Sequence, residues 1–161
     1  MQLKISHPFW QVVGIGALAG MRTSSAPAIT SHILSHHRSK RLEHSPLSFM
    51  QSKTVADTLK FLSMGELVMD KLPSTPNRIK PAGLAFRCLS GALAGASINK
   101  ATGGKVLAGA LLGGAAAIAS TYITFILRKT IVKDTGIIDP IIGAIEDALV
   151  IGAGISLAQI A

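Results

Sequence analysis

The sequence predicts an all-α integral membrane protein, with about four to five hydrophobic segments in a single transmembrane domain over residues 1–161. Hydrophobic residues make up 48% of the chain and charged residues only 15%, whereas a soluble domain carries roughly 25% charge. Residues 106–127 contain no charge and have the length of roughly 20 residues that crosses a hydrocarbon core. The net charge of +8 comes from lysines and arginines between the apolar segments, which is typical of membrane-protein loops and argues against a nucleic-acid partner.

The first hydrophobic segment is expected over residues 8–35 as an interrupted helix. Pro8 suits a first helical turn, and Pro27 should kink or break the helix after Arg22. The next residues, 36–53, are polar and basic and predict an extramembrane loop.

Four more helical segments follow. The second covers residues 54–71, and three prolines predict a rigid connector at 72–81. The third covers 82–99 and the fourth is the uncharged segment 106–127. A loop at 128–136 should then lead to a fifth helix from 139 to the C-terminus, with Pro140 in its first turn.

Three copies of the motif GAL(A/L)G occur in the first, third and fourth segments. Two glycines four residues apart form a flat strip on which another helix backbone can approach closely. We therefore expect helix packing, and a homo-oligomer, through Gly16, Gly20, Gly91, Gly95, Gly109 and Gly113.

A weak duplication accompanies these motifs. The order of a GAL(A/L)G helix, a basic loop and a helix with an acidic pair occurs over 16–70 and again over 109–147. If all five segments cross the membrane, the two copies face opposite ways as an inverted repeat, which is typical of transporters. The basic residues divide almost evenly between the two sides, so they do not predict an orientation.

Six charged residues lie within the hydrophobic segments. A charge at the bilayer centre costs about 3 kcal/mol, so such residues normally pair or face water. Two interpretations remain open: ion pairs that fasten the helices together, or a hydrated cavity that binds a proton, an ion or an anionic group. The candidate residues are Arg22, Glu66, Asp70, Arg87, Glu146 and Asp147. Because Glu146 and Asp147 are adjacent on a helix, only one of them can point straight at a given partner.

Other chemistry has little support in the sequence. The histidines His32, His36, His37 and His44 have no acidic or cysteine ligand at a persuasive spacing, so we expect no metal site. Ser24 and Ser25 lack a neighbouring histidine base. We therefore predict no catalytic residue and no cofactor.

The combination of GMRTSSAPA, ELVMDKLPSTPNRIKPAGLAFRCLSGALAGA and DPIIGAIEDALVIGAG resembles the bacterial membrane proteins grouped as domain of unknown function 4126. The resemblance spans most of the chain, and it implies an integral membrane protein without supplying an activity. The matching positions are Arg22, Pro27, Glu66, Asp70, Lys71, Pro73, Pro76, Arg78, Pro81, Arg87, Glu146 and Asp147.

Three functions follow from these expectations, for a protein that we place in the lipid bilayer of a bacterial inner membrane. The first is a small transporter or channel-like protein with a charged site in the membrane. The second is a scaffold or accessory subunit whose charges only fasten helices. The third, less favoured because an enzyme lacks a recognisable motif here, is a membrane-embedded enzyme that acts on a lipid or isoprenoid phosphate.

Overall fold

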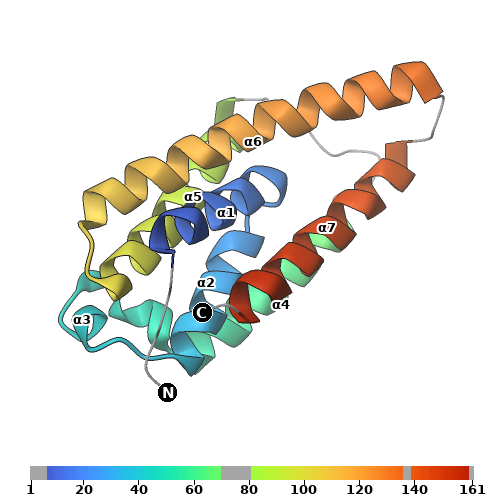
Figure 1. Ribbon diagram of the computed structural model, residues 1–161. Helices are drawn as coiled ribbons and strands as arrows, with labels where there is room; N and C mark the ends of the chain where they lie inside the picture. Colours follow the sequence, from blue (N-terminus) through green and yellow to red (C-terminus); the bar gives the residue numbers. More distant parts are fainter. Residues whose placement is uncertain (1–6, 70–80, 136–138, 160–161) are drawn as a thin grey trace.

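A computed structural model of the chain describes residues 7–69, 81–135 and 139–159, which form helices joined by short turns (Figure 1). The prediction of an all-α fold is confirmed, since no strand occurs among these residues. The connector predicted at 72–81 lies, apart from Pro81, outside the described residues. The elements in order are α1 (Pro8–Met21), α2 (Ser25–His36), α3 (Lys40–Glu43), the 3-10 helix η1 (Pro46–Gln51), α4 (Lys53–Met69), α5 (Pro81–Thr102), α6 (Val106–Thr135) and α7 (Asp139–Gln159).

The centre of the fold is a three-helix contact between α1, α5 and α6 that is made by glycines. A Cβ atom added to Gly16 or to Gly91 would lie 2.5 Å from the carbonyl oxygen of Gly113. Added Cβ atoms at the other four motif glycines would also meet backbone of a neighbouring helix at less than 3 Å. All six glycines therefore pack helices within one chain. Their surfaces are already covered, so they are not available as the oligomer interface that the motifs predicted.

The glycine contacts also fix the direction of each helix. Gly16 meets Gly113 and Gly20 meets Ala117, so α1 and α6 run in the same direction. Gly91 meets Gly113 whereas Gly95 meets Gly109, so α5 runs antiparallel to α6. The predicted inverted repeat is therefore wrong, because it requires the first and third GAL(A/L)G motifs to run in opposite directions.

Helices α1 and α2 form a hairpin rather than one interrupted helix that continues through the fold. The break predicted near Pro27 is present, but α1 ends at Met21, and Pro27 lies in the first turn of α2, where a missing N–H group costs little. The chain then turns back. The position of Ser39, just after α2, shows this, since its hydroxyl donates a hydrogen bond of 2.7 Å to the carbonyl of Ala101 near the end of α5. We call Arg22–Ser24 the hairpin tip.

One end of the bundle, which we call the loop end, carries residues 37–52 and the turn between α5 and α6. Arg41 donates a hydrogen bond of 2.6 Å to the carbonyl of Thr102, and Gly103 ends α5 with a positive φ of 98°. Arg41 lies at this end with half of the lysines and arginines of the described chain, the others being Arg38, Lys40, Lys53, Lys100 and Lys105. The start of α1 lies near this end too. Val12 of α1 packs against Gly95 of α5, and Gly95 in turn packs against Gly109 near the start of α6.

Helix α6, which corresponds to the fourth predicted segment at 106–127, is longer than the sequence predicted. The loop expected at residues 128–136 is helical as far as Thr135. No glycine or proline interrupts this stretch before Gly136, and Arg128 and Lys129 are good helix formers, so the helix continues past the uncharged segment.

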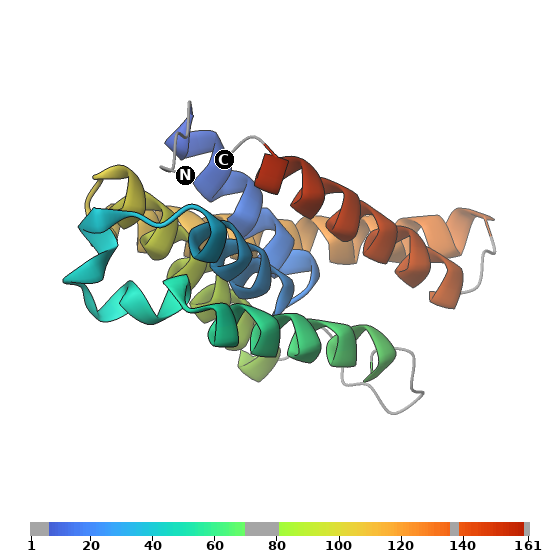
Figure 2. The same cartoon turned by 90° about the horizontal axis from the view of Figure 1, so that it is seen from below.

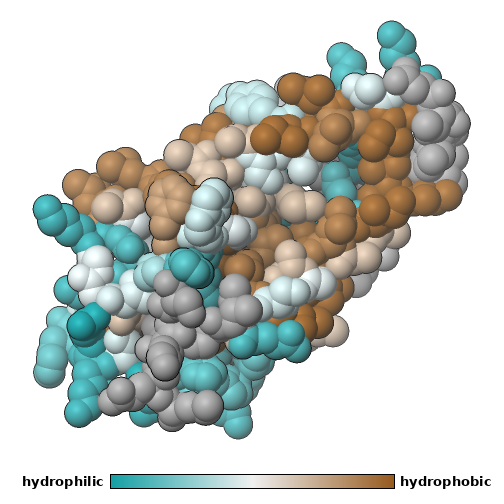
Figure 3. Space-filling view, in the orientation of Figure 1, coloured by the Kyte–Doolittle hydropathy of each residue, from teal (hydrophilic) through white to brown (hydrophobic). Residues whose placement is uncertain are grey.

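Two of the described helices are long and apolar enough to cross a membrane: α6 over Val106–Lys133 and α7 over Ile141–Gln159. Most of their residues are exposed, since only 22% and 28% of the respective apolar windows are buried. Figure 3 shows this apolar surface over α6 and α7, and polar residues gathered at the loop end. The exposed large side chains on the two helices are Val106, Leu107, Leu111, Tyr122, Ile123, Ile126, Leu127, Ile131, Ile141, Ile145, Leu149, Ile151 and Ile155.

Candidate functional site at the hairpin tip

The hairpin tip opens the helical backbone in the interior of the bundle. Arg22 has extended dihedral angles (φ −140°, ψ 118°), and its N–H group still donates 2.8 Å to the carbonyl of Leu18. The carbonyl of Gly20 has lost the partner that a continuous helix would supply four residues later. It accepts hydrogen bonds from the side chains of Arg87 on α5 and Thr121 on α6 instead.

Glu66 on α4 caps the start of α2. Its carboxylate accepts hydrogen bonds from the N–H groups of Thr23 (2.9 Å) and Ser24 (2.7 Å), and also from the Ser24 hydroxyl. The first N–H groups of a helix have no partner within the helix and carry a partial positive charge, so a carboxylate is the favoured acceptor there. Glu66 therefore supplies the negative cap that the side chains of α2 do not.

Arg22 and Asp147 form an ion pair between the hairpin tip and α7. Both residues are buried, with 2% and 8% of their surface exposed. A buried ion pair that loses one member leaves an uncompensated charge, so this contact couples the position of α7 to that of the tip.

The neighbouring residue, Glu146, points to a different partner. Its carboxylate lies 3.6 Å from the guanidinium of Arg128 on α6. The two adjacent acids thus pair with two different arginines, one at the hairpin tip and one on α6. This is expected because neighbouring side chains on a helix point about 100° apart.

The structure brings five of the six predicted charged residues close to the hairpin tip or to its contacts. Arg22, Glu66, Arg87 and Asp147 meet at the tip, and Glu146 lies beside it on α7. Asp70 lies outside the described residues. Figure 2 shows α4 and α7 on opposite sides of the hairpin, so the two acidic helices approach the tip from two directions.

Sequence reasoning missed the hydroxyl groups and the second arginine pair. Ser90 on α5 donates to the carbonyl of Thr23, and Thr121 donates to Gly20 at 3.2 Å. Arg128 was assigned to a loop. A serine or threonine inside an apolar helix is a signal for such contacts, but it is a weak one, because these hydroxyls also bond their own helix, as Thr121 does with Ala117 at 2.8 Å.

The hairpin tip gathers several polar and charged groups in one place. A carboxylate, a guanidinium and unwound backbone lie together in the bundle interior. Such groups are the usual components of ion and proton sites in membrane helices. Within 7–69, 81–135 and 139–159, no group of three or more His, Cys, Asp or Glu side chains is placed to hold a metal ion.

Comparison with known proteins gives one match. No curated protein and no solved structure matches the chain. A family model described as "Domain of unknown function (DUF4126)" matches residues 10–160, which is almost the whole chain and includes all six predicted charged residues. The chain therefore belongs to the DUF4126 family.

Proposed function

We propose that this protein is a small integral membrane protein, of a bacterial inner membrane, that moves a proton or small ion through the hairpin tip. The observation that carries the proposal is the position of the break: a charged, unwound segment lies beside the middle of α6, a helix that is long and apolar enough to cross a membrane. Gly20 meets Ala117 and Thr121, which lie near the middle of the uncharged stretch 106–127.

The dimensions of α6 support a location in the bilayer. Its 22 uncharged residues would measure about 33 Å, close to the roughly 30 Å of a hydrocarbon core. Lys105 precedes this stretch and Arg128 follows it, so both ends would reach the headgroups. The hairpin would then enter from the face at the loop end and return to it, as a re-entrant segment with its tip near the midplane.

Irregular backbone at this depth is tolerated only where protein or water satisfies it. Broken helices with charged side chains around them are the usual way in which transporters build a site at the midplane. In this chain the break is contacted by side chains from four other helices: Glu66 of α4, Arg87 and Ser90 of α5, Thr121 of α6 and Asp147 of α7.

The second candidate is a scaffold or accessory subunit, and a different observation favours it. The Thr23 and Ser24 N–H groups and the Gly20 and Thr23 carbonyls each have a partner within the chain. A tip whose groups are satisfied in this way can fasten α4, α5 and α7 to the hairpin without binding any solute.

A flux experiment separates the two candidates. The protein is reconstituted into vesicles that contain a pH-sensitive dye, and proton or monovalent-cation flux is recorded after a pulse of acid or salt. For a transporter, Glu66→Gln should abolish the flux of a folded, monodisperse protein, because the amide cannot carry the negative charge. Glu43→Gln, which changes an exposed carboxylate at the loop end, is the matched control and should keep the flux.

The outcomes have distinct meanings. Flux that persists in Glu66→Gln would overturn the assignment of the site to the hairpin tip. A wild-type protein without flux for protons or monovalent cations, and with Glu66→Gln unfolded, would instead support the scaffold.

A further inference from the structure

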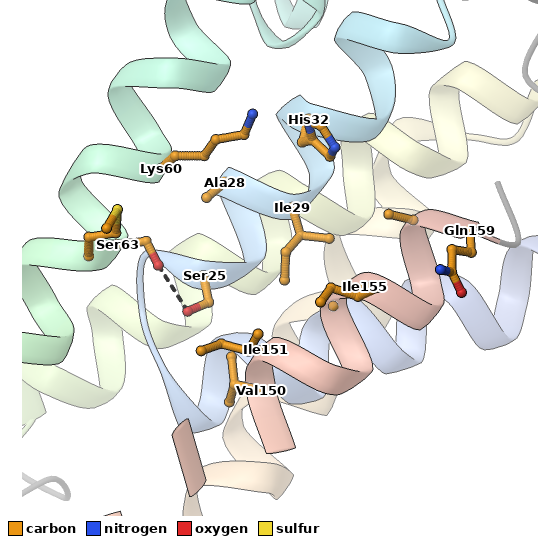
Figure 4. Close-up of a pocket in the computed structure, with 13 residues that line it drawn as sticks. Ser25, Ala28, Ile29, His32, Lys60, Ser63, Val150, Ile151, Ile155 and Gln159 are labelled. Atoms are coloured by element: carbon orange, nitrogen blue, oxygen red, sulfur yellow. Dashed lines mark hydrogen bonds between the residues drawn. The ribbon is translucent and has the colours of Figure 1, made fainter. Parts of the chain in front are cut away.

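A groove of about 730 Å³ lies between α4 and α7, with α2 between them (Figure 4). The groove is separate from the network of hydrogen bonds at the hairpin tip, but one end of the groove lies beside that network. Ser25 and Ser63 mark this end, where their hydroxyl oxygens lie 3.2 Å apart. His32 and Lys60 mark the other end, toward the loop end of the bundle.

The middle of the groove is apolar. It is lined there by Ala28 and Ile29 of α2 and by Val150, Ile151 and Ile155 of α7. A hydrated ion gains nothing from such walls, whereas each methylene group of an alkyl chain gains free energy when it leaves water for them. The groove therefore suits a hydrocarbon chain and not the ion that we assign to the tip.

The end near the loop end is positively charged. The Lys60 ammonium group and the His32 imidazole lie together there (Figure 4). Asp57 lies 3.6 Å from the Lys60 nitrogen, but it is exposed and does not line the groove, and none of the described residues that line it is acidic. An anionic headgroup would meet a donor and a cation at this position.

The depth of the two ends matches the shape of a lipid. His32 lies four residues before the end of α2, about one turn from the loop end, while Ser25 directly follows the hairpin tip. In the bilayer orientation given above, the charged end would lie at headgroup level and the apolar part would lead toward the midplane. We propose that the groove binds an acyl chain of an anionic phospholipid of the leaflet at the loop end, with its phosphate at Lys60 and His32. This proposal rests on the membrane location in the proposed function.

Native mass spectrometry of the detergent-purified protein tests this site. The probes are phosphatidylglycerol and phosphatidylcholine with the same acyl chains, titrated separately. Phosphatidylglycerol should bind more tightly, and Lys60→Gln should weaken its binding by about fivefold, which is the contribution of one lysine near a membrane surface. Lys53→Gln, at an exposed lysine on the same helix that does not line the groove, should leave the binding unchanged.

A second pair of variants tests the apolar part. Ile151→Trp places a large side chain in the groove and should remove the tightly bound lipid, whereas Ile145→Trp, at an equally exposed isoleucine of α7 outside the groove, should not. Equal binding of the two lipids together with no effect of Lys60→Gln would overturn the proposal, even if Ile151→Trp failed to fold. Lipid that stays bound to folded Ile151→Trp would overturn it as well.

The readout is independent of transport. Tight lipid binding by a protein that shows no flux would leave this inference standing and remove the proposed transport function. Flux by a protein without a preferred phospholipid would do the reverse.

Discussion

Arg22 and Asp147 form an ion pair in the interior of the bundle, although 125 positions separate them in the chain. Arg22 belongs to the hairpin tip and Asp147 to α7, a helix with a largely exposed surface. The pair therefore holds a peripheral helix against the hairpin tip, where the backbone is unwound in the core. Whether the tip serves transport or only assembly, the structure predicts measurable consequences for each contact at this point.

The first prediction concerns the ion pair itself. Asp147→Asn should lower the free energy of unfolding by about 3–5 kcal/mol, because the buried Arg22 guanidinium loses the carboxylate with which it pairs. Replacing both residues, with Arg22→Met and Asp147→Leu, should recover most of that loss, since neither member of this pair is then left as a buried charge without the other. An unfolding titration with sodium dodecyl sulfate, followed by circular dichroism, measures all the variants. A loss below about 1 kcal/mol in Asp147→Asn would show that the pair is solvated.

The second prediction concerns the cap on α2. Glu66→Gln should destabilise the protein by about 1–3 kcal/mol, because two backbone N–H groups lose a charged acceptor. The loss should be local as well as global: hydrogen exchange at the amides of Thr23 and Ser24 should become faster than in the parent protein. Glu43→Gln removes a carboxylate at the loop end and should leave both amides unchanged. Unaltered exchange in Glu66→Gln would contradict the assigned cap.

The third prediction tests the glycine contacts. Gly113→Ala adds one methyl group where it would meet the backbone of Gly91, and overpacking of this kind costs typically 1–3 kcal/mol. Gly152→Ala is the matched control on α7, because nothing lies within 4 Å of its added Cβ atom. It should be neutral or stabilising by up to about 1 kcal/mol, as expected for alanine in place of glycine in a helix. The same unfolding titration compares the two, and equal stability would contradict the close packing of α5 on α6.

Much of the fold could be predicted from local signals in the sequence. Pro27 and the small residues before it indicate a break after Arg22, and the charge-free stretch 106–127 indicates the apolar part of α6. Glycines at a spacing of four indicate close helix contacts. These signals lie within one turn or one helix, so a single sequence contains them.

The course of the chain after the break could not be predicted in the same way. A helix that resumes after an extended residue can continue forward or turn back, and the choice depends on contacts distant in the sequence. Glu66, 42 positions after Ser24, caps α2 only in the hairpin arrangement. The expectation that the first segment continues forward also produced the predicted inverted repeat, which the common direction of α1 and α6 contradicts.

The ion-pair partners of the charged residues could not be predicted from the sequence either. The sequence offers Arg22 four acids in two helices, and the depth and rotation of α7 decide that it meets Asp147 while Glu146 turns to Arg128. Because Arg128 was placed in a loop, its pairing was excluded in advance. The longer α6 did have a local signal, because no glycine or proline interrupts residues 128–135.

The measurement that tests the central claim most directly is the sidedness of three single cysteines in a Cys88→Ala background. Cysteines replace His7 before α1, Lys40 after α2 and Lys129 near the far end of α6, all of which are exposed. A membrane-impermeant thiol reagent is then applied to each face of sealed, oriented vesicles. The account predicts that the cysteines at His7 and Lys40 react from the same face and the one at Lys129 from the opposite face. Reaction of the His7 and Lys40 cysteines from opposite faces would contradict it, because α1 and α2 would then cross the membrane instead of returning from a charged tip at its centre.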